Sequence, residues 1–268
     1  MKKIYIIILV LMAGFAGWYI WFDLRSGDRP NPISVNNEQQ GQPDLAAQNQ
    51  NSTTSLQFQE QNDAAKTEDA KLKSLALKII SEPIIFKTSL PEDSKKLFTQ
   101  KINEINDLVK QDYNYLNQWL DLGSYRKLMG DYTGAIDAWN FAAVIRPKDY
   151  VIFHNLGDLY GFYLKNYSKA EENFLKSIVL KPANEDAYIQ LATIYQYSYK
   201  EKSGETEGIL LKGISSNLGS ATLRIALGNY YKTIGRNIDA LKYFEDAFKL
   251  VPNNVSLQQD IELLKKSI

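Results

Sequence analysis

The chain lacks the residues on which many catalytic and metal sites depend. It has no cysteine and a single histidine, His154. Without cysteine it forms no disulfide bonds and no metal sites built from thiolates. It also lacks a glycine-rich phosphate loop ending in Gly-Lys-Ser or Gly-Lys-Thr, and the two-histidine motif of zinc hydrolases. The sequence therefore predicts no catalytic residue, no metal site and no cofactor, and a protein that is not an enzyme.

No excess of charge of either sign is present, because 31 lysines and arginines balance 31 aspartates and glutamates. A protein that binds nucleic acid usually carries a basic surplus, since it must neutralise phosphates. The composition therefore predicts no nucleic-acid partner. Short charged pairs such as Glu171-Glu172 and Glu201-Lys202 are interpreted as solvated surface rather than as parts of a site.

What the sequence does contain begins with an uncharged run from Ile4 to Phe22, preceded by two lysines. As a helix rising about 1.5 Å per residue, this run nearly spans the hydrocarbon core of a bilayer. Its far end carries Trp18, Tyr19 and Trp21, as expected for aromatic residues at a membrane surface. We predict one N-terminal transmembrane helix in residues 1–23, with residues 4–22 in the membrane.

The flanking charges predict the orientation of this helix. Beyond it, Arg25 and Arg29 are interleaved with aspartates, and no lysine or arginine follows from residue 31 to residue 65. The positive-inside rule then places the N-terminus in the cytoplasm and the rest of a single-pass membrane protein outside it. The alternative is a cleaved signal peptide with Gly14 and Ala16 near the cleavage site, which would release a secreted protein.

Residues 24–65 are rich in asparagine, glutamine, serine, aspartate and proline, and their aliphatic residues show no period. Such a segment buries too little apolar surface to offset the entropy lost on ordering. We predict a disordered polar linker with a root-mean-square span on the order of 35 Å. This linker would hold the following domain away from the membrane.

One pattern of large and small residues then recurs four times, with a spacing of about 34 to 36 positions. The first copy contains Trp119, Leu122, Gly123, Arg126, Ala135, Trp139, Ala142 and Pro147. The second contains Phe153, Leu156, Gly157, Tyr160, Ala170, Phe174, Ser177 and Pro182. The third contains Tyr188, Leu191, Ala192, Tyr195, Thr206, Leu210 and Gly213, with Leu218 in place of the proline. The fourth contains Leu227, Gly228, Tyr231, Ala240, Phe244, Ala247 and Pro252.

The residue types of this pattern have a physical reading. Small residues such as Gly123 and Ala142 let two antiparallel helices approach closely, and large neighbours fill the space beside them. The prolines end the second helix of each pair. One extra residue after Tyr160 and two after Tyr195 are expected in the loops between helices, which tolerate insertions. Because one pair cannot bury its apolar face alone, the four pairs are expected to stack.

The spacing W-x2-L-G-x2-Y, A-x3-F, P resembles the tetratricopeptide repeat family over about residues 116–254. The resemblance implies an all-α fold, a right-handed α-α superhelix of four helix pairs. Capping helices are expected on both sides. Residues 66–115 would form a capping segment and half repeat, with a helix over residues 94–110, whereas residues 72–86 suit either a short helix or an extended segment. Residues 255–268 would form a C-terminal capping helix.

The resemblance also implies a binding surface, because five positions of each first helix line a concave groove in this family. The predicted protein-binding groove residues are Asn117, Leu120, Ser124, Lys127, His154, Asp158, Phe162, Ile189, Thr193, Gln196, Tyr197, Ile225, Asn229 and Lys232. Their mixture of apolar, amide and aromatic side chains is typical of peptide interfaces. Leu120 and Asp186 stand where family members that bind a terminal carboxylate need lysine, which argues against that subtype.

The predicted function is a membrane-tethered scaffold for protein–protein interaction in a cell-envelope assembly or secretion complex, with a protein or peptide in the groove. One alternative is a self-associating structural protein of the envelope, a homo-oligomer formed through the repeat ends or through Ala13 and Gly17. Another is a hydrolytic enzyme in which His154 acts as a base oriented by Asp158, one helical turn away. A further alternative is that some of the groove residues only pack against the capping helices.

Overall fold

The computed structural model describes the backbone from Gln48 to Ile268, and its side chains from Gln61 onwards. In this part of the chain the regular structure is entirely helical and contains no strand. The predicted transmembrane helix in residues 1–23 lies outside the described residues, as does the linker up to residue 47. Among the helices described, none combines the length and the apolar character needed to cross a membrane. Residues 61–268 form one compact unit.

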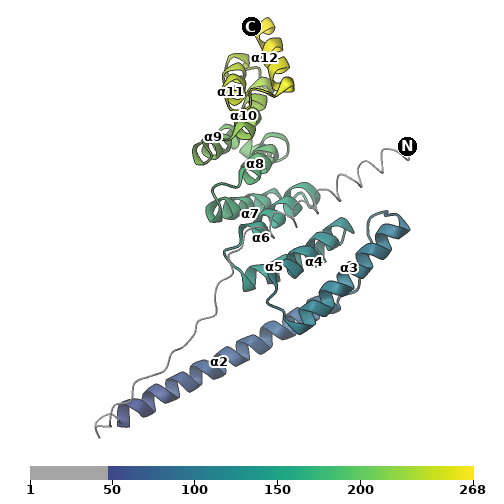
Figure 1. The fold of residues 1–268 in the computed structure, drawn as a ribbon, viewed down its shortest axis with the longest axis vertical. Helices are drawn as coiled ribbons and strands as arrows, with labels where there is room; N and C mark the ends of the chain where they lie inside the picture. The colour runs from purple at the N-terminus through teal and green to yellow at the C-terminus, as the bar shows by residue number, and fades with distance from the viewer. Residues whose placement is uncertain (1–47) are drawn as a thin grey trace. The chain divides into compact units, whose positions relative to one another are not determined.

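Helix α2 runs from Gln48 to Ser81 (Figure 1). The prediction of a disordered linker up to residue 65 is therefore wrong for residues 48–65. This stretch contains no proline or glycine, and its glutamines, alanines and charged residues favour helix even though they bury little apolar surface. The low hydropathy of these residues indicates that they bury no core of their own. It does not prevent them from forming a helix, because helix formation also depends on the helix propensity of each residue. After Ser81 the chain is extended, so residues 72–86 combine the two structures that the sequence left open.

Helix α3 spans Glu92–Gln111 and begins after Pro91, in agreement with the predicted helix over residues 94–110. Its buried residues Ile102, Ile105 and Val109 join one hydrophobic cluster with Ala76, Ile79 and Ile80 from the end of α2. The Asn106 side-chain amide also donates to the Ile80 carbonyl over 3.1 Å. The two N-terminal helices thereby cover the first repeat.

Four helix pairs follow in sequence order and form a superhelical stack like that of tetratricopeptide repeats (Figure 1). The first helices are α4 (Leu116–Leu128), α6 (Tyr150–Asp158), α8 (Glu185–Tyr197) and α10 (Ala221–Thr233). The second helices are α5 (Tyr132–Ile145), α7 (Tyr167–Leu180), α9 (Thr206–Ser216) and α11 (Asn237–Leu250). Each pair begins and ends close to the positions expected from the small residues and prolines.

Glycines mark the close approach within three of the pairs. A methyl group added at Gly157 would lie 2.8 Å from the Phe174 ring, which no side chain tolerates without movement. Gly123 faces the Trp139 ring and Gly228 faces the Phe244 ring in the same way. The close approach was predicted correctly, but the small residue meets the aromatic ring of the second helix rather than the alanine.

The turns inside the helix pairs repeat one backbone conformation. Gly130 and Gly235 have φ angles of 79° and 78°, and Lys165 has 54° at the corresponding turn of the second pair. Side chains rarely adopt this left-handed conformation, whereas glycine adopts it freely. Glycine therefore fits the backbone of the first and fourth turns, whereas the backbone of the second turn is strained at Lys165.

The extra residues of the second and third copies are not accommodated as simple loops. In the second copy α6 continues as a π-helical turn, η1 (Leu159–Tyr163), in which the Leu164 amide donates to the Leu159 carbonyl over 3.0 Å. In the third copy a 3-10 helix, η2 (Lys200–Glu205), connects α8 and α9. The expectation of loop insertions is wrong because the backbone amides of the additional residues form helical hydrogen bonds instead of facing water.

The C-terminal helix α12 spans Val255–Ser267 and packs against α11. Leu257, Ile261 and Leu264 are its buried residues. Two ion pairs fix the helix at its edges: Lys232 lies 2.8 Å from Asp260, and Lys265 lies 2.7 Å from Glu245. Residues 255–267 thus form a helix, in the segment 255–268 where the sequence predicted a C-terminal capping helix.

Candidate functional site

All fourteen predicted groove residues lie on the first helices of the four pairs or on η1, and none of them is fully buried. Leu120, Ile189 and Ile225 are half-buried, and each packs against a hydrophobic cluster from one side. Phe162 and Tyr197 are the large apolar residues of the set that are most open to solvent. The predicted set therefore forms an accessible surface with an apolar component, which the term predicted groove denotes below.

One ion pair connects the first two repeats within the predicted groove. Lys127 Nζ lies 2.5 Å from Asp158 Oδ2 and 4.9 Å from the centre of the Tyr163 ring. Both charged side chains are mostly shielded from solvent. Because each charge already has a partner, neither is available to bind a charged ligand unless the pair opens.

His154 is held by amide side chains of the third repeat. Its Nδ1 lies 3.3 Å from Asn184 Nδ2, and its Nε2 lies 3.3 Å from the side-chain amide of Gln190. Burial lowers the pKa of the imidazole, and this effect outweighs the opposing influence of Asp186 and Asp158. The ring is therefore neutral at pH 7, with one nitrogen that donates and one that accepts.

The pairing of His154 with Asp158 that the enzyme alternative requires is not formed. Asp158 pairs with Lys127, and the imidazole nitrogens face Asn184 and Gln190. The expectation fails because residues one turn apart on a helix point in similar directions, and each side chain then finds a closer partner on the neighbouring repeat. The arrangement fixes the His154 ring but gives it no carboxylate to orient it as a base.

Two of the remaining polar side chains in the predicted groove bind their own helix. The Ser124 and Thr193 hydroxyls donate over 2.8 Å to the carbonyls of Leu120 and Ile189. Gln196 differs, because its amide nitrogen is buried and has no hydrogen-bond partner among the described residues. Leaving such a group unpaired costs about 1–3 kcal/mol.

The fourth repeat continues the surface with Ile225, Asn229 and Lys232. Asn229 and Lys232 are exposed, and Lys232 forms its ion pair with Asp260 of α12. Lys127 likewise links α4 to α6, so in both cases a lysine of a first helix pairs with an aspartate two helices further along the chain. Of these contacts, the ion pair of Lys127 with Asp158 joins two predicted residues of neighbouring repeats, whereas His154 and Lys232 contact residues outside the predicted set.

The second helix pair identifies the type of repeat. Residues 150–184 match the family model of the tetratricopeptide repeat. This match supports the tetratricopeptide repeat as the unit of the stack. It contains three of the predicted groove residues, His154, Asp158 and Phe162, and runs from the start of α6 to the residue before α8.

Comparison with individual proteins adds more distant similarities. The chain is 28% identical over 127 residues to BBSome complex member BBS4 of Bos taurus, a match that covers 47% of this chain and 24% of that protein. The chain thus spans about a quarter of the length of this curated relative. The solved structure of MamA has 21% identity and a TM-score of 0.49, covering 63% of this chain and 99% of its own. YrrB, described as a TPR protein with an unusual peptide-binding site, has 13% identity and a TM-score of 0.45, covering 61% and 82%.

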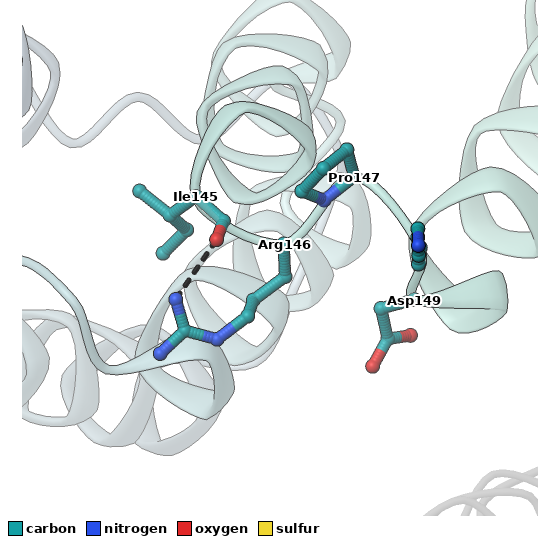
Figure 2. Close-up of a pocket in the computed structure, with 5 residues that line it drawn as sticks. Ile145, Arg146, Pro147 and Asp149 are labelled. Atoms are coloured by element: carbon teal, nitrogen blue, oxygen red, sulfur yellow. Dashed lines mark hydrogen bonds between the residues drawn. The ribbon is translucent and has the colours of Figure 1, made fainter. Parts of the chain in front are cut away.

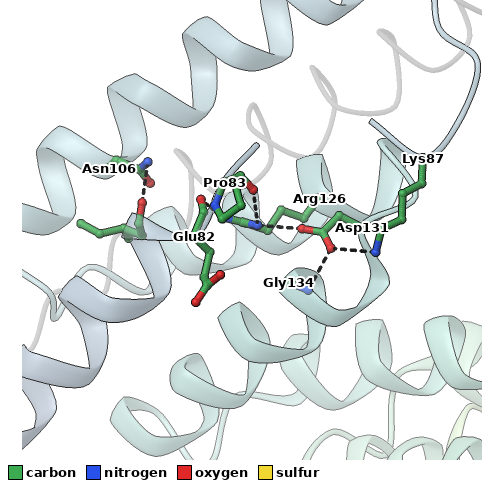
Figure 3. Close-up of polar contacts among 8 residues, drawn as sticks. Glu82, Pro83, Lys87, Asn106, Arg126, Asp131 and Gly134 are labelled. Carbon is green, nitrogen blue, oxygen red and sulfur yellow. Dashed lines mark hydrogen bonds and ion pairs between the residues drawn. The ribbon is translucent and has the colours of Figure 1, made fainter. Parts of the chain in front are cut away.

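A polar network at the first tetratricopeptide-like repeat was missed by the sequence analysis (Figure 3). The buried Arg126 guanidinium lies 2.7 Å from the Asp131 carboxylate and donates to the Glu82 carbonyl over 3.1 Å. Lys87 Nζ lies 3.5 Å from the same carboxylate. The signal in the sequence was Arg126 itself, which stands where the other repeats have tyrosine.

The backbone of the same segment is attached to the end of α4. The amides of Lys87 and Thr88 both donate to the Met129 carbonyl, over 2.7 Å and 3.1 Å. The Thr88 hydroxyl donates to the Leu128 carbonyl over 3.1 Å. The extended segment after α2 therefore satisfies carbonyl groups that the C-terminal end of a helix leaves unpaired. This network holds the segment after α2 against the first repeat.

A surface hollow between α5 and α6 is lined by Ile145, Arg146, Pro147, Lys148 and Asp149 (Figure 2). Its polar side chains bind backbone groups at the ends of the two helices. Arg146 donates to the Ile145 carbonyl over 2.8 Å, and Asp149 accepts from the Val151 amide over 2.8 Å. No predicted groove residue lines it. The hollow is a connection between repeats and shows no chemistry of its own.

Proposed function

We propose that this chain is a membrane-tethered tetratricopeptide-type scaffold that holds a protein or peptide partner in the predicted groove. The observation that carries the proposal is the accessible surface formed by fourteen residues of four successive first helices. Its polar side chains are fixed by contacts between repeats, such as Lys127 with Asp158 and His154 with Asn184. A surface that is ordered in advance loses little entropy when a partner binds.

The chemistry of the surface supports a peptide as the partner. Leu120, Ile189 and Ile225 supply half-buried aliphatic contacts, and Phe162 and Tyr197 supply aromatic ones. Aromatic residues of this kind often dominate the binding energy of an interface.

The cellular setting of the proposal rests on the sequence alone. Residues 4–22 would anchor the protein in a membrane with the N-terminus in the cytoplasm and the repeats outside it, within an envelope assembly or secretion complex. Protease added to intact cells with a permeable outer layer should remove the repeat domain while the inner membrane is closed. Digestion only after that membrane is opened would contradict the orientation.

The binding proposal is tested by crosslinking in cells from single positions of the predicted groove. A photoreactive amino acid is placed at Asn117 or Asn229, which are exposed, and at Lys212 on the second helix α9 as the control. We expect one shared partner to be caught from the two groove positions and not from Lys212. The captured protein is identified by mass spectrometry.

Two outcomes of this experiment would reject the proposal. Equal capture from Lys212 would show that the adducts do not depend on the predicted groove. Capture of only a second copy of the chain would favour the self-associating envelope protein instead.

A further inference from the structure

The buried hydrophobic residues of the described chain fall into two clusters, and the division lies inside the second repeat. One cluster comprises residues between 76 and 159, and the other comprises residues between 170 and 264. Helix α6 therefore belongs to the first cluster and α7 to the second. The two helices meet where Gly157 faces the Phe174 ring, and the half-buried Tyr160 packs against both clusters. We call this division of the core the seam.

His154 connects α6 to the far side of the seam. Its ring lies edge-on to the ring of Phe174 in α7, with 5.6 Å between the ring centres. Its two nitrogens each lie 3.3 Å from a side-chain amide, one of Asn184 and one of Gln190, which both come after α7 in the chain. His154 is the only histidine of the chain, and histidine is the side chain whose ordinary pKa lies near neutral pH. The seam therefore contains a group that can respond to mild acid.

The hydrogen bonds across the seam require a neutral imidazole, which has one accepting and one donating nitrogen. The Asn184 amide nitrogen also donates to Ser177 Oγ over 3.0 Å, which fixes this nitrogen towards the ring and makes Nδ1 the acceptor. Nε2 is then the donor. Gln190 Oε1 is buried and has no hydrogen-bond partner among the described residues, and half a turn of its amide brings this oxygen to Nε2. In a protonated ring Nδ1 would also be a donor, and it would face the donor of Asn184.

The charged groups around the ring give a protonated His154 little compensation. Asp158 of α6 is already paired with Lys127 of α4, Asp186 of α8 is exposed to solvent, and Lys181 at the end of α7 is positive. Burial is the first cause that lowers the pKa of His154, and it outweighs the attraction of Asp186 and Asp158 for the charged ring. A proton on this ring is therefore better accommodated when the ring is in water.

Asn184 has an alternative partner once it leaves the ring. It stands at the N-cap of α8, but its side chain does not cap that helix. At the N-caps of α6, α10 and α12, the side chains of Asp149, Ser220 and Asn254 accept hydrogen bonds from backbone amides of their own helices. Capping the free amides of α8 in the same way would offset part of the cost of releasing Asn184 from His154.

We propose that His154 is a proton-operated latch at the seam, in which the neutral ring holds Asn184 and Gln190 and a protonated ring favours opening between α6 and the helices that follow. In the open state the ring is in water, where its pKa is about 6.5. Because its pKa is lower in the closed state, the latch is fully effective above that pH and weakens as the pH falls below it. The latch is measured on the free protein and stands independently of the proposed function.

The test uses a buried thiol to measure how often the seam opens. Because the chain has no cysteine, the Ala170→Cys chain carries a single thiol. Ala170 is 0% exposed and faces Gly161 of η1, so a disulfide reagent reaches this thiol only when α7 separates from η1. The matched control is Ala240→Cys, at the same position of the fourth repeat, where the alanine is also 0% exposed.

Labelling rates are measured on the full chain in detergent and divided by the rate of the exposed thiol in Lys212→Cys at the same pH. Between about pH 7.5 and about pH 5.5, the relative rate of Ala170→Cys should rise about threefold to tenfold, about tenfold being the limit for one proton and an open-state pKa of about 6.5. The rate of Ala240→Cys should change less than about twofold. No rise at Ala170→Cys, or an equal rise at both positions, would overturn the inference.

Two substitutions in the Ala170→Cys chain identify the latch. His154→Gln cannot titrate and should abolish the rise. Asn184→Asp places a carboxylate beside Nδ1 that favours the charged ring, so acid should no longer open the seam. The control Asn254→Asp makes the same change at the N-cap of α12 and should leave the rise intact. A rise that persists in His154→Gln or in Asn184→Asp would contradict the assignment of the latch to this pair.

A second measurement needs no introduced thiol. In urea unfolding, lowering the pH over the same range should raise the unfolding equilibrium constant of the unmodified chain about threefold to tenfold more than that of His154→Gln. Asp121 and Asp137, whose pKa values burial raises, are present in both proteins and cancel in this ratio. An equal pH dependence of the two proteins would mean that folding does not change the proton affinity of His154, and the inference would be wrong.

Discussion

Arg126 of the first repeat and Tyr231 of the fourth occupy the same repeat position, three residues after Gly123 and Gly228, but they have different partners. The Tyr231 hydroxyl donates to Glu207 over 2.7 Å, and Arg236 lies 3.0 Å from the same carboxylate. This glutamate belongs to the preceding second helix, α9. Arg126 follows no complete repeat, and it binds Asp131 and the backbone carbonyls of the segment after α2.

The junction between the second and third repeats follows the rule of the fourth repeat. The Tyr195 hydroxyl donates to Glu171 over 2.6 Å, and Lys202 of η2 lies 3.3 Å from that carboxylate. A tyrosine, a glutamate of the preceding second helix and a cation thus recur at two internal junctions. The comparison teaches that an internal junction uses side chains from both repeats, whereas the end of the stack uses a buried ion pair and backbone carbonyls.

The largest effect is expected at the end of the stack. Arg126→Ala leaves the Asp131 carboxylate buried with only the more exposed Lys87 beside it, and the free energy of unfolding should fall by about 3–5 kcal/mol. Urea denaturation followed by circular dichroism measures this change. The control Arg224→Ala removes a less buried arginine of α10 and should cost under about 1 kcal/mol. Similar losses in the two variants would show that the two junction types do not differ.

A smaller effect is expected at an internal junction. Tyr231→Phe removes the hydroxyl that donates to Glu207 and should lower the free energy of unfolding by about 1–2 kcal/mol, since the acceptor is charged. The same denaturation experiment checks it, with Tyr243→Phe as a control on a tyrosine of α11. A loss as large as that of Arg126→Ala would contradict the ranking of the two junctions.

Alkaline pH should lower the stability of the protein by ionising the tyrosines of the internal junctions. Burial first, and then the hydrogen bond to the glutamate, raises the pKa of both Tyr195 and Tyr231. An unfolded tyrosine has a pKa of about 10, so their contribution to stability is complete below that pH and is lost as the pH rises through the higher folded values. The variant Tyr195→Phe/Tyr231→Phe should therefore lose less stability between about pH 9 and about pH 11. An unchanged slope would show that these hydroxyls ionise equally in the two states.

The smallest effect is expected at the second internal turn. Lys165→Gly relieves the left-handed conformation that glycine already occupies in the first and fourth repeats, and it should stabilise the protein by about 0.5–1 kcal/mol. Thermal unfolding measures the change, and Lys169→Gly in α7 serves as a destabilising control. A loss of stability in Lys165→Gly would mean that the lysine side chain contributes more than its backbone strain costs.

The repeats were predictable because side chains determine them. A small residue opposite a large one, such as Gly157 opposite Phe174, indicates where two helices approach closely, and a proline indicates where a helix ends. The helix pairs and their order could therefore be predicted from one sequence. The attachment of the first repeat was not predictable in this way, since Glu82 and Pro83 act through backbone carbonyls that no residue pattern reveals. Helical residues 48–65 were missed because polar composition was taken as evidence of disorder.

For the predicted groove, the sequence indicated positions but not partners. Periodicity places His154 and Asp158 on one helix face, and only the packing of neighbouring repeats turns Asp158 towards Lys127 and His154 towards Asn184. The exposed apolar side chains Tyr163 and Leu164 lie at a π-helical turn. The sequence showed the extra residue after Tyr160 but not the helical form that it takes. Contacts between repeats thus require the structure, because they join residues about 30 positions apart.

Helix α12 also limits how this protein could grow in evolution. Ten positions after Pro147 and Pro182 stand the small residues Gly157 and Ala192, and Gly157 admits the Phe174 ring of its second helix. Ten positions after Pro252 stands Glu262. A helix pair duplicated beyond α12 would bring an aromatic ring against that carboxylate. Glu262 therefore makes α12 poorly suited to be the first helix of a further pair of the same kind.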